Sequence, residues 1–173
     1  AASASAAISA GVFTVPNSIQ PAVAVRGDAL ARGRAWLVDQ GVEGPYVTYL
    51  GNLHPRKNIA RAIRAFTDVV TTEPSLASHQ FVIAGARWFS GDEEERAAAD
   101  APPGSIRFLG RIDDEQRDVL LQEAEALVYV SMFEGFGLPP LEAMARGTAV
   151  VAADSTSIPE VCGDAAVLVD PLD

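Results

Sequence analysis

An alternation of short apolar runs with longer segments of helical periodicity constrains the fold of this chain more than any other feature. The apolar runs predict strands at residues 45–50, 80–84, 106–110, 126–131, 148–153 and 165–169. Apolar residues at steps of three and four predict helices between them. Strands that are apolar on both faces and alternate with helices are typical of a parallel sheet covered by helices. We therefore expect an α/β fold, a three-layer sandwich of about six parallel strands with helices on both faces.

Local signals define the ends of several predicted helices. Residues 58–70 place apolar side chains on one helical face, formed by Ile59, Ala62, Ile63, Phe66, Val69 and Val70. Asp113 and Gln116 have the spacing of a capping box at the start of another helix. Ser157 predicts the cap of a short helix. Residues 20–43 carry no strong strand pattern, and we expect them to wrap the sheet or to connect it to preceding sequence.

Composition and charge exclude several classes of function. The net charge is −10, and a surface that negative repels phosphate backbones, so we expect no nucleic-acid partner. The single Cys162 excludes an internal disulfide and a cysteine-based metal site. The sequence has no run of about 18 apolar residues, which predicts no membrane span in this chain. It also lacks metal-ligand spacings and a G-x-G-x-x-G motif, so we expect neither a metal nor a dinucleotide cofactor.

Unusual chemistry follows three of the predicted strands. In an open parallel sheet, ligands bind in the crevice beyond the carboxyl ends of the strands. The segments GNLHPRKN, RIDDEQ and MFEGFGLPPLE each come directly after a predicted strand. If the sheet is parallel, all three loops lie on the same edge, and we expect the ligand there.

The EGFGLPPLE segment combines carboxylates with a predicted helix N-terminus. Gly135 and Gly137 leave the backbone open to a ligand, and the N–H groups of Gly137 and Leu138 form an anion site. Glu134 and Glu142, eight residues apart, can accept hydrogen bonds from hydroxyls. An anion flanked by hydroxyl groups describes a nucleotide sugar. The alternative is a glycine turn into a helix, with Glu142 favoured only by the helix dipole.

Arg56 and Lys57 form an adjacent basic pair beyond the strand predicted at residues 45–50. Cations are unfavourable at a helix start, so their position favours a function, and two such cations could clamp a diphosphate. The alternative is a pair of solvated charges. His54 lies in the same loop, and a lone histidine is more often structural.

The segments GNLHPRKN, FVIAG and IRFLGRIDDEQ, and above all residues 133–172, resemble the C-terminal, donor-binding domain of family 4 retaining glycosyltransferases. These enzymes have the GT-B architecture, in which two Rossmann-like domains face each other across a cleft. The resemblance spans residues 46–173 and implies that this chain is one half of a GT-B fold. It also implies that residues 1–20 are a remnant of the N-terminal domain with the interdomain linker. Residues 21–173 would then be the nucleotide-sugar-binding domain, truncated at its C-terminus.

The resemblance also implies a role for each candidate residue. Glu134 would bind the donor hexose hydroxyls, Glu142 the ribose hydroxyls, and Arg56 with Lys57 would neutralise the diphosphate leaving group. Gly51 would let the backbone approach the ligand. The loop backbone would contact the sugar and the phosphates through Gly135, Phe136, Gly137 and Leu138. The nucleotide base would lie beside Arg111 and Ile112.

The expected reaction is transfer of a hexose from a GDP- or UDP-linked donor to an acceptor hydroxyl, with retention and without a metal. The residues of these motifs resemble those of mannosyltransferases. The acceptor, a glycan or a lipid-linked sugar, would bind the absent N-terminal domain, so we expect this chain alone to be inactive. The full-length protein would be cytoplasmic and peripheral at the inner membrane face. The alternatives are a non-catalytic nucleotide-sugar-binding module, another GT-B enzyme such as a nucleotide-sugar epimerase, and a plain interaction domain.

Overall fold

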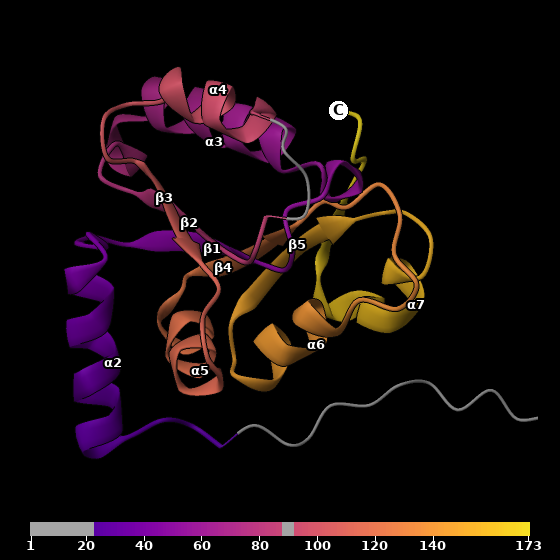
Figure 1. Ribbon diagram of the computed structural model, residues 1–173. Helices are drawn as coiled ribbons and strands as arrows, with labels where there is room; N and C mark the ends of the chain where they lie inside the picture. Colours follow the sequence, from indigo (N-terminus) through magenta and orange to yellow (C-terminus); the bar gives the residue numbers. More distant parts are fainter. Residues whose placement is uncertain (1–22, 88–91) are drawn as a thin grey trace, which may run out of the picture.

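The computed structural model describes residues 23–87 and 92–173 and contains one parallel sheet of six strands (Figure 1). The strands are β1 (Tyr46–Leu50), β2 (Gln80–Ala84), β3 (Ile106–Gly110), β4 (Ala126–Tyr129), β5 (Ala149–Ala153) and β6 (Val167–Val169). The predicted fold class is confirmed. The predicted bounds of β2 and β3 coincide with the observed ones, whereas β4 and β6 are each two residues shorter than predicted.

The strand order β3-β2-β1-β4-β5-β6 shows that the chain builds the sheet outward from its centre in two directions. The connecting helices are α3 (Ile59–Thr72), α4 (Glu93–Ala99), α5 (Asp114–Glu123), α6 (Leu138–Ala145) and α7 (Ile158–Cys162). Right-handed crossovers in opposite directions place helices on opposite faces. Accordingly, α3 and α4 cover one face, and α5, α6 and α7 cover the other (Figure 1). The order reverses between β1 and β4, which is where such folds hold their ligands.

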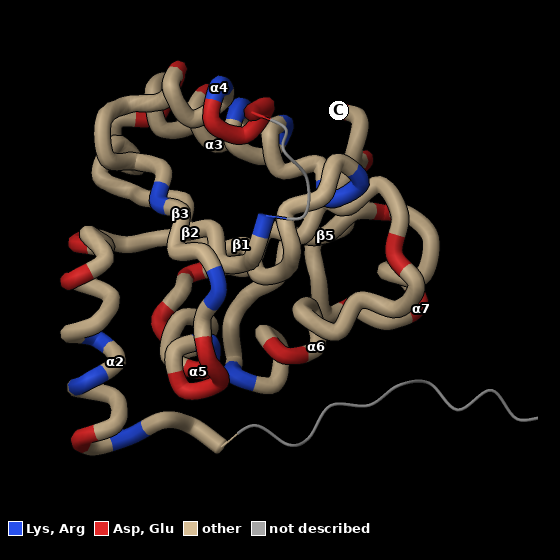
Figure 2. The backbone as a smooth tube through the Cα atoms, viewed as in Figure 1, with Lys and Arg blue, Asp and Glu red and all other residues tan. Residues whose placement is uncertain are grey.

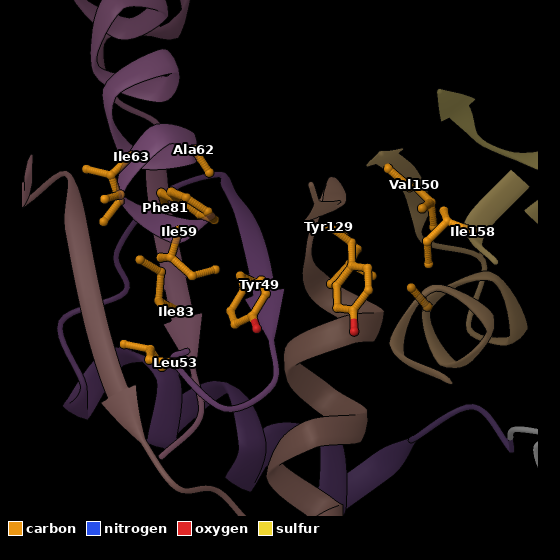
Figure 3. Packing of buried hydrophobic residues seen from close by; sticks show 14 of the residues in the cluster. Tyr49, Leu53, Ile59, Ala62, Ile63, Phe81, Ile83, Tyr129, Val150 and Ile158 are labelled. Atoms are coloured by element: carbon orange, nitrogen blue, oxygen red, sulfur yellow. The ribbon is translucent and has the colours of Figure 1, made fainter. Parts of the chain in front are cut away.

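The core is formed by the strands and the helical faces that pack on them (Figure 3). Ile59 and Ile63 of α3 lie against Phe81 and Ile83 of β2, and all four are essentially inaccessible to solvent. Burying each such side chain contributes about 1.5–3 kcal/mol. Val69, predicted on the buried face of α3, is 44% exposed. No described helix covers the neighbouring part of this face, because the crossovers to β4, β5 and β6 all run on the opposite side.

A helix occupies much of the segment for which no regular structure was predicted. This helix, α2 (Gly27–Asp39), packs on α5, and a Cβ atom at Gly33 would lie 2.4 Å from the Val119 side chain. Glycine is therefore required at this helix crossing. The expectations for residues 1–20, including the domain boundary, lie outside the described residues.

The capping box predicted at α5 is confirmed. The Asp113 carboxylate accepts from the Gln116 backbone N–H at 2.8 Å, and the Gln116 side chain accepts from the Asp113 backbone N–H at 2.9 Å. The cap fixes where the chain turns from the carboxyl end of β3 into the helix.

Candidate functional site

The loops after β1 and β4 lie side by side, because these two strands are neighbours in the sheet. The backbone N–H of Met132 donates to the carbonyl of Arg56 at 2.8 Å. The Arg56 guanidinium in turn donates to the carbonyl of Phe133 at 2.7 Å. The structure therefore brings the basic pair to the loop between β4 and α6, which we call the glycine-rich loop.

The conformation of the basic loop is determined by His54 and Asn58. Residues Pro55–Lys57 form a single 3-10 turn, and His54 Nδ1 accepts from the Arg56 N–H at 3.2 Å. Asn58 has a left-handed φ of 61°, and its amide donates to the carbonyls of Val130 at 3.3 Å and Pro171 at 2.7 Å. His54, whose role the sequence left open, acts as a cap for this turn.

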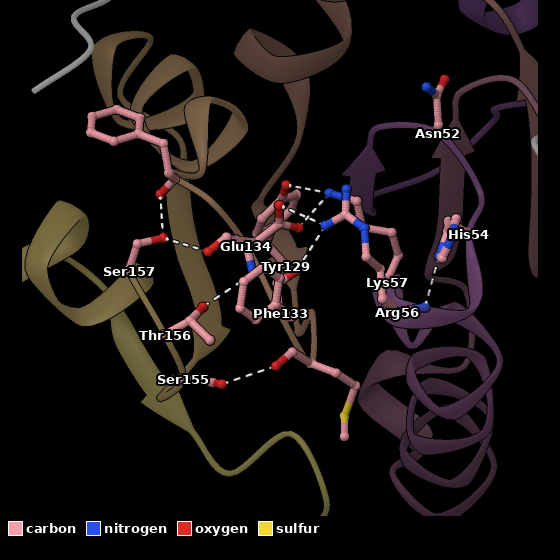
Figure 4. Close-up of polar contacts among 12 residues, drawn as sticks. Asn52, His54, Arg56, Lys57, Tyr129, Phe133, Glu134, Ser155, Thr156 and Ser157 are labelled. Atoms are coloured by element: carbon pink, nitrogen blue, oxygen red, sulfur yellow. Dashed lines mark hydrogen bonds and ion pairs between the residues drawn. The ribbon is translucent and has the colours of Figure 1, made fainter.

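An ion-pair centre connects the two loops (Figure 4). The Lys57 ammonium donates to the Glu134 carboxylate and to the Tyr129 hydroxyl, the latter at 2.9 Å, and lies 5.0 Å from the centre of the Tyr129 ring. The Arg56 guanidinium contacts the other Glu134 oxygen at 3.1 Å. Lys57 and Glu134 are each only 7% exposed. Two positive charges thus face one carboxylate. Elsewhere the chain carries acidic residues on α2, α4, α5 and α6 (Figure 2).

Burial and pairing shift the pKa values of this centre. Burial lowers the pKa of Lys57 below its ordinary value, and the bond to Glu134 opposes that shift without cancelling it. Burial also acts to raise the pKa of Glu134, but the hydrogen bonds and charge of the groups around it, Lys57 foremost, together outweigh burial and leave that pKa below its ordinary value. Burial and the nearby carboxylate raise the pKa of Tyr129, so its hydroxyl keeps its proton.

The glycine-rich loop presents backbone N–H groups without internal acceptors. Within residues 23–87 and 92–173, no acceptor bonds the N–H groups of Gly135, Phe136, Gly137 or Leu138. Gly137 has a φ of 99°, and a Cβ atom there would lie 2.5 Å from the Ile158 side chain, so the fold itself requires glycine. At Gly135 a Cβ atom would meet open space, so nothing described in the chain requires glycine at that position.

Hydroxyls from the loop after β5 hold the glycine-rich loop, a contact that sequence analysis did not predict. Ser157 stands at the N-cap position of α7, but the prediction that its side chain caps this helix is wrong. Its hydroxyl donates instead to the carbonyls of Glu134 at 3.1 Å and Phe136 at 3.0 Å. The Thr156 hydroxyl accepts from the Glu134 N–H at 3.1 Å. These contacts join residues that are 21 to 23 positions apart, so no local pattern reveals them.

Glu142 lies on α6, apart from the ion-pair centre. Its carboxylate is half-buried and is 3.8 Å from the Arg117 guanidinium of α5. Arg117 also contacts Asp118 at 2.9 Å and Asp114 at 2.8 Å, so its charge is shared among three carboxylates. The Glu142 carboxylate is therefore only loosely held.

The remaining candidates lie on the same edge of the sheet but are less closely joined to the centre. Gly51 follows β1 with a φ of 145°, and a Cβ atom there would lie 2.8 Å from the Tyr49 hydroxyl. Arg111 and Ile112 follow β3, which is separated from β1 by β2. Arg111 is exposed, whereas Ile112 packs against a core cluster.

Residues 23–87 and 92–173 also bear on other classes of site. They contain no group of three or more histidine, cysteine, aspartate or glutamate side chains placed to hold a metal ion. None of the helices in the same part of the chain has the length and hydrophobicity needed to cross a bilayer.

Comparison with known proteins gives consistent matches. The family model described as glycosyl transferases group 1 matches residues 39–173. The O-antigen chain mannosyltransferase B of Escherichia coli is 39% identical over 132 residues, which cover 74% of this chain and 33% of that protein. A phosphatidyl-myo-inositol mannosyltransferase of Mycolicibacterium smegmatis is 38% identical over 127 residues, which cover 70% of this chain and 31% of that protein.

A solved structure shows the same fold. The C-terminal domain of a glycosyl transferase group 1 family protein (LpcC) from Francisella tularensis matches with a TM-score of 0.64 and 27% identity. The match covers 81% of this chain and 74% of that one. By contrast, the chain spans about a third of the length of the curated relatives described above.

Proposed function

The chain belongs to the group 1 glycosyl transferase family, and we propose that it is the donor-binding half of an enzyme that transfers a hexose from a nucleoside-diphosphate sugar to an acceptor hydroxyl. Its fold is Rossmann-like, and its structural relatives are GT-B glycosyltransferases. The observation that carries the proposal is the meeting of two cations with a row of unpaired backbone N–H groups where the strand order reverses. Both kinds of donor favour a diphosphate.

The ion-pair centre suggests how the donor is bound. Arg56 and Lys57 now share the Glu134 carboxylate, and a diphosphate carries more negative charge than one carboxylate. The diphosphate would therefore compete for both cations and release Glu134 to accept hydrogen bonds from the hexose hydroxyls. Arg56 is the more accessible of the two cations, so it would make the first contact.

The transition state of glycosyl transfer resembles an oxocarbenium ion, and negative charge grows on the departing diphosphate. Arg56, Lys57 and the N–H groups at the start of α6 are directed to that charge before the reaction begins. A preorganised donor of this kind contributes about 3–4 kcal/mol to the transition state at other anion-stabilising sites. In this proposal Arg56 and Lys57 bind and stabilise the leaving group.

The other candidate residues would define the ends of the donor. Glu142 is loosely held and lies on α6, so it would bind the ribose hydroxyls. Arg111 and Ile112 would flank the base, and Gly51 would lie beside the ligand. We take mannose as the hexose, because both curated relatives described above are named as mannosyltransferases. The same names favour transfer over epimerisation.

In this proposal, the rest of the enzyme corresponds to the parts of the curated relatives that this chain does not match. We propose that the chain is the C-terminal half of a family 4 enzyme, and that the other half binds a glycan or a lipid-linked acceptor. Transfer would retain the anomeric configuration, and this chain alone would bind the donor without turning it over. The complete enzyme would act in the cytoplasm at the inner membrane face.

The proposal is tested by titrating the chain with GDP and with UDP in a calorimeter. We expect one of the two to bind, and we expect Arg56→Ala to weaken that binding about tenfold or more, as for a charge-assisted bond to phosphate. Arg32→Ala is the matched control, because Arg32 is also an exposed arginine in an ion pair but lies on α2. Binding of neither nucleotide, or equal loss in both variants, would contradict the proposal.

A further inference from the structure

Ser157 has a hydrogen-bonding arrangement that a helix cap does not need. A serine at the N-cap position normally accepts from a backbone N–H of the first helical turn. Here the α7 helix has no such bond, and the hydroxyl lies between two carbonyls of the glycine-rich loop, those of Glu134 at 3.1 Å and Phe136 at 3.0 Å. A hydroxyl has one proton, which these two carbonyls share. The hydroxyl is thus directed to the loop between β4 and α6.

The two carbonyls determine where the next N–H groups point. In a trans peptide unit the C=O and the following N–H point in opposite directions. The carbonyls of Glu134 and Phe136 face Ser157, so the N–H groups of Gly135 and Gly137 point away from it. In Figure 4, Ser157 lies on one side of Glu134, and Arg56 and Lys57 lie on the other.

We propose that Ser157 is a positioning residue, which turns the two peptide units before Gly135 and Gly137 so that their N–H groups face the diphosphate of the donor. The inference rests on the proposed function, because it needs a phosphate for these N–H groups to bind. It goes beyond that function by assigning the orientation of the loop to a side chain from another strand end. Ser157 itself makes no contact with the donor in this arrangement.

Neighbouring contacts make this orientation rigid. Thr156 holds a left-handed φ of 53°, unusual for a branched side chain, and its hydroxyl accepts from the Glu134 N–H. The side chain of Ile158 lies only 2.5 Å from where a Cβ atom of residue 137 would be. Residues 156–158 therefore contact the loop at three successive positions, and these contacts favour one direction of the Ser157 hydroxyl.

The first test compares three variants of the 173-residue chain by calorimetry with GDP and UDP. Ser157→Ala should weaken binding of whichever nucleotide the wild type binds by about three- to tenfold, the range expected for one net hydrogen bond. Ser157→Thr keeps the hydroxyl and should restore the affinity. Ser155→Ala is the matched control. Its hydroxyl donates to the carbonyl of Met132 at 3.1 Å, outside the two glycine peptide units, so affinity should not change.

The second test reads the two N–H groups directly by nuclear magnetic resonance. In the wild type, the amide proton signals of Gly135 and Gly137 should move downfield on addition of the nucleotide, as N–H groups do when they bond to phosphate. In Ser157→Ala this response should be reduced at both glycines, while signals elsewhere respond as before. A variant that merely loosens the fold would instead alter the signals across α6 and α7 before any nucleotide is added.

The outcomes separate this inference from the function on which it rests. If the wild type binds neither nucleotide, the proposed function fails and the inference fails with it. If the wild type binds but Ser157→Ala binds equally well, or if Ser155→Ala loses as much, only the inference is wrong. If the Gly135 and Gly137 signals of Ser157→Ala move on nucleotide addition as far as those of the wild type, the inference is wrong as well.

Discussion

Removing both partners of the Lys57–Glu134 pair should cost clearly less stability than the sum of the two single removals. Lys57→Met keeps the apolar stem but leaves the Glu134 carboxylate with Arg56 at 3.1 Å as its charged partner, while Glu134→Gln leaves the buried ammonium with the Tyr129 hydroxyl. Breaking a buried ion pair from one side costs about 3–5 kcal/mol. One polar partner remains in each single variant, Arg56 for the carboxylate and the Tyr129 hydroxyl for the ammonium, so we expect about 2–3 kcal/mol for each change.

The assay is a double-mutant cycle on urea unfolding of the 173-residue chain. The double variant has neither buried charge, so its loss should fall short of the sum of the single losses by about 2 kcal/mol. The exposed pair of Arg32 and Glu115, 3.0 Å apart, is the control, and its coupling should stay below about 1 kcal/mol. Additive losses at Lys57 and Glu134, within about 0.5 kcal/mol, would refute the reasoning that burial makes this pair strong.

Three further predictions follow from the geometry of the site. Gly137→Ala forces a Cβ atom to 2.5 Å from Ile158 at a φ of 99° and should lower the free energy of unfolding by about 2 kcal/mol, whereas Gly135→Ala meets open space and should leave it within about 0.5 kcal/mol. If Gly137→Ala and Gly135→Ala lowered the free energy of unfolding by the same amount, this prediction would be refuted. Asn58→Ala loses two amide hydrogen bonds and a residue tolerant of left-handed φ, so it should cost about 2–3 kcal/mol, and Asn58→Gly, which keeps the φ, should cost about 1 kcal/mol less. Urea unfolding gives both values. If Asn58→Gly were no more stable than Asn58→Ala, the role assigned to the left-handed φ would be wrong. The folded-state pKa of Glu134 lies below its ordinary value of 4.5, so the stability that it contributes is present above pH 4.5 and is lost as the pH falls through the lower folded-state value. The difference in melting temperature between wild type and Glu134→Gln should therefore shrink as the pH falls below 4.5, and a constant difference there would count against the pairing.

Local sequence signals were sufficient for most of the fold. The bounds of β2 and β3 and the capping box of Asp113 and Gln116 depend on side chains within a few residues of one another. The α2 helix was not predicted, because only Gly33 and Leu37 of its residues are buried. Its apolar face is too narrow to produce a helical pattern, and its packing on α5 stabilises it instead.

The candidate site was predicted as a set of residues but not as an arrangement. The glycines, the glutamates and the basic pair were identified because their chemistry is unusual at strand ends. The sequence did not indicate that Lys57 is buried against Glu134 and Tyr129, because these residues are 77 and 72 positions apart. It also misassigned Ser157, whose local position is that of a helix cap.

The sequence by itself determined most of the segments that become strands and helices, since periodicity, caps and turn residues act over a few positions. It also determined that the chemically distinctive loops follow the strands, so that a parallel sheet gathers them on one edge. Only the tertiary structure decided that β4 lies beside β1, which brings the loop of Lys57 to that of Glu134. Strand order and the direction of the Ser157 hydroxyl depend on contacts between distant residues, and such contacts exist only after the sheet has assembled.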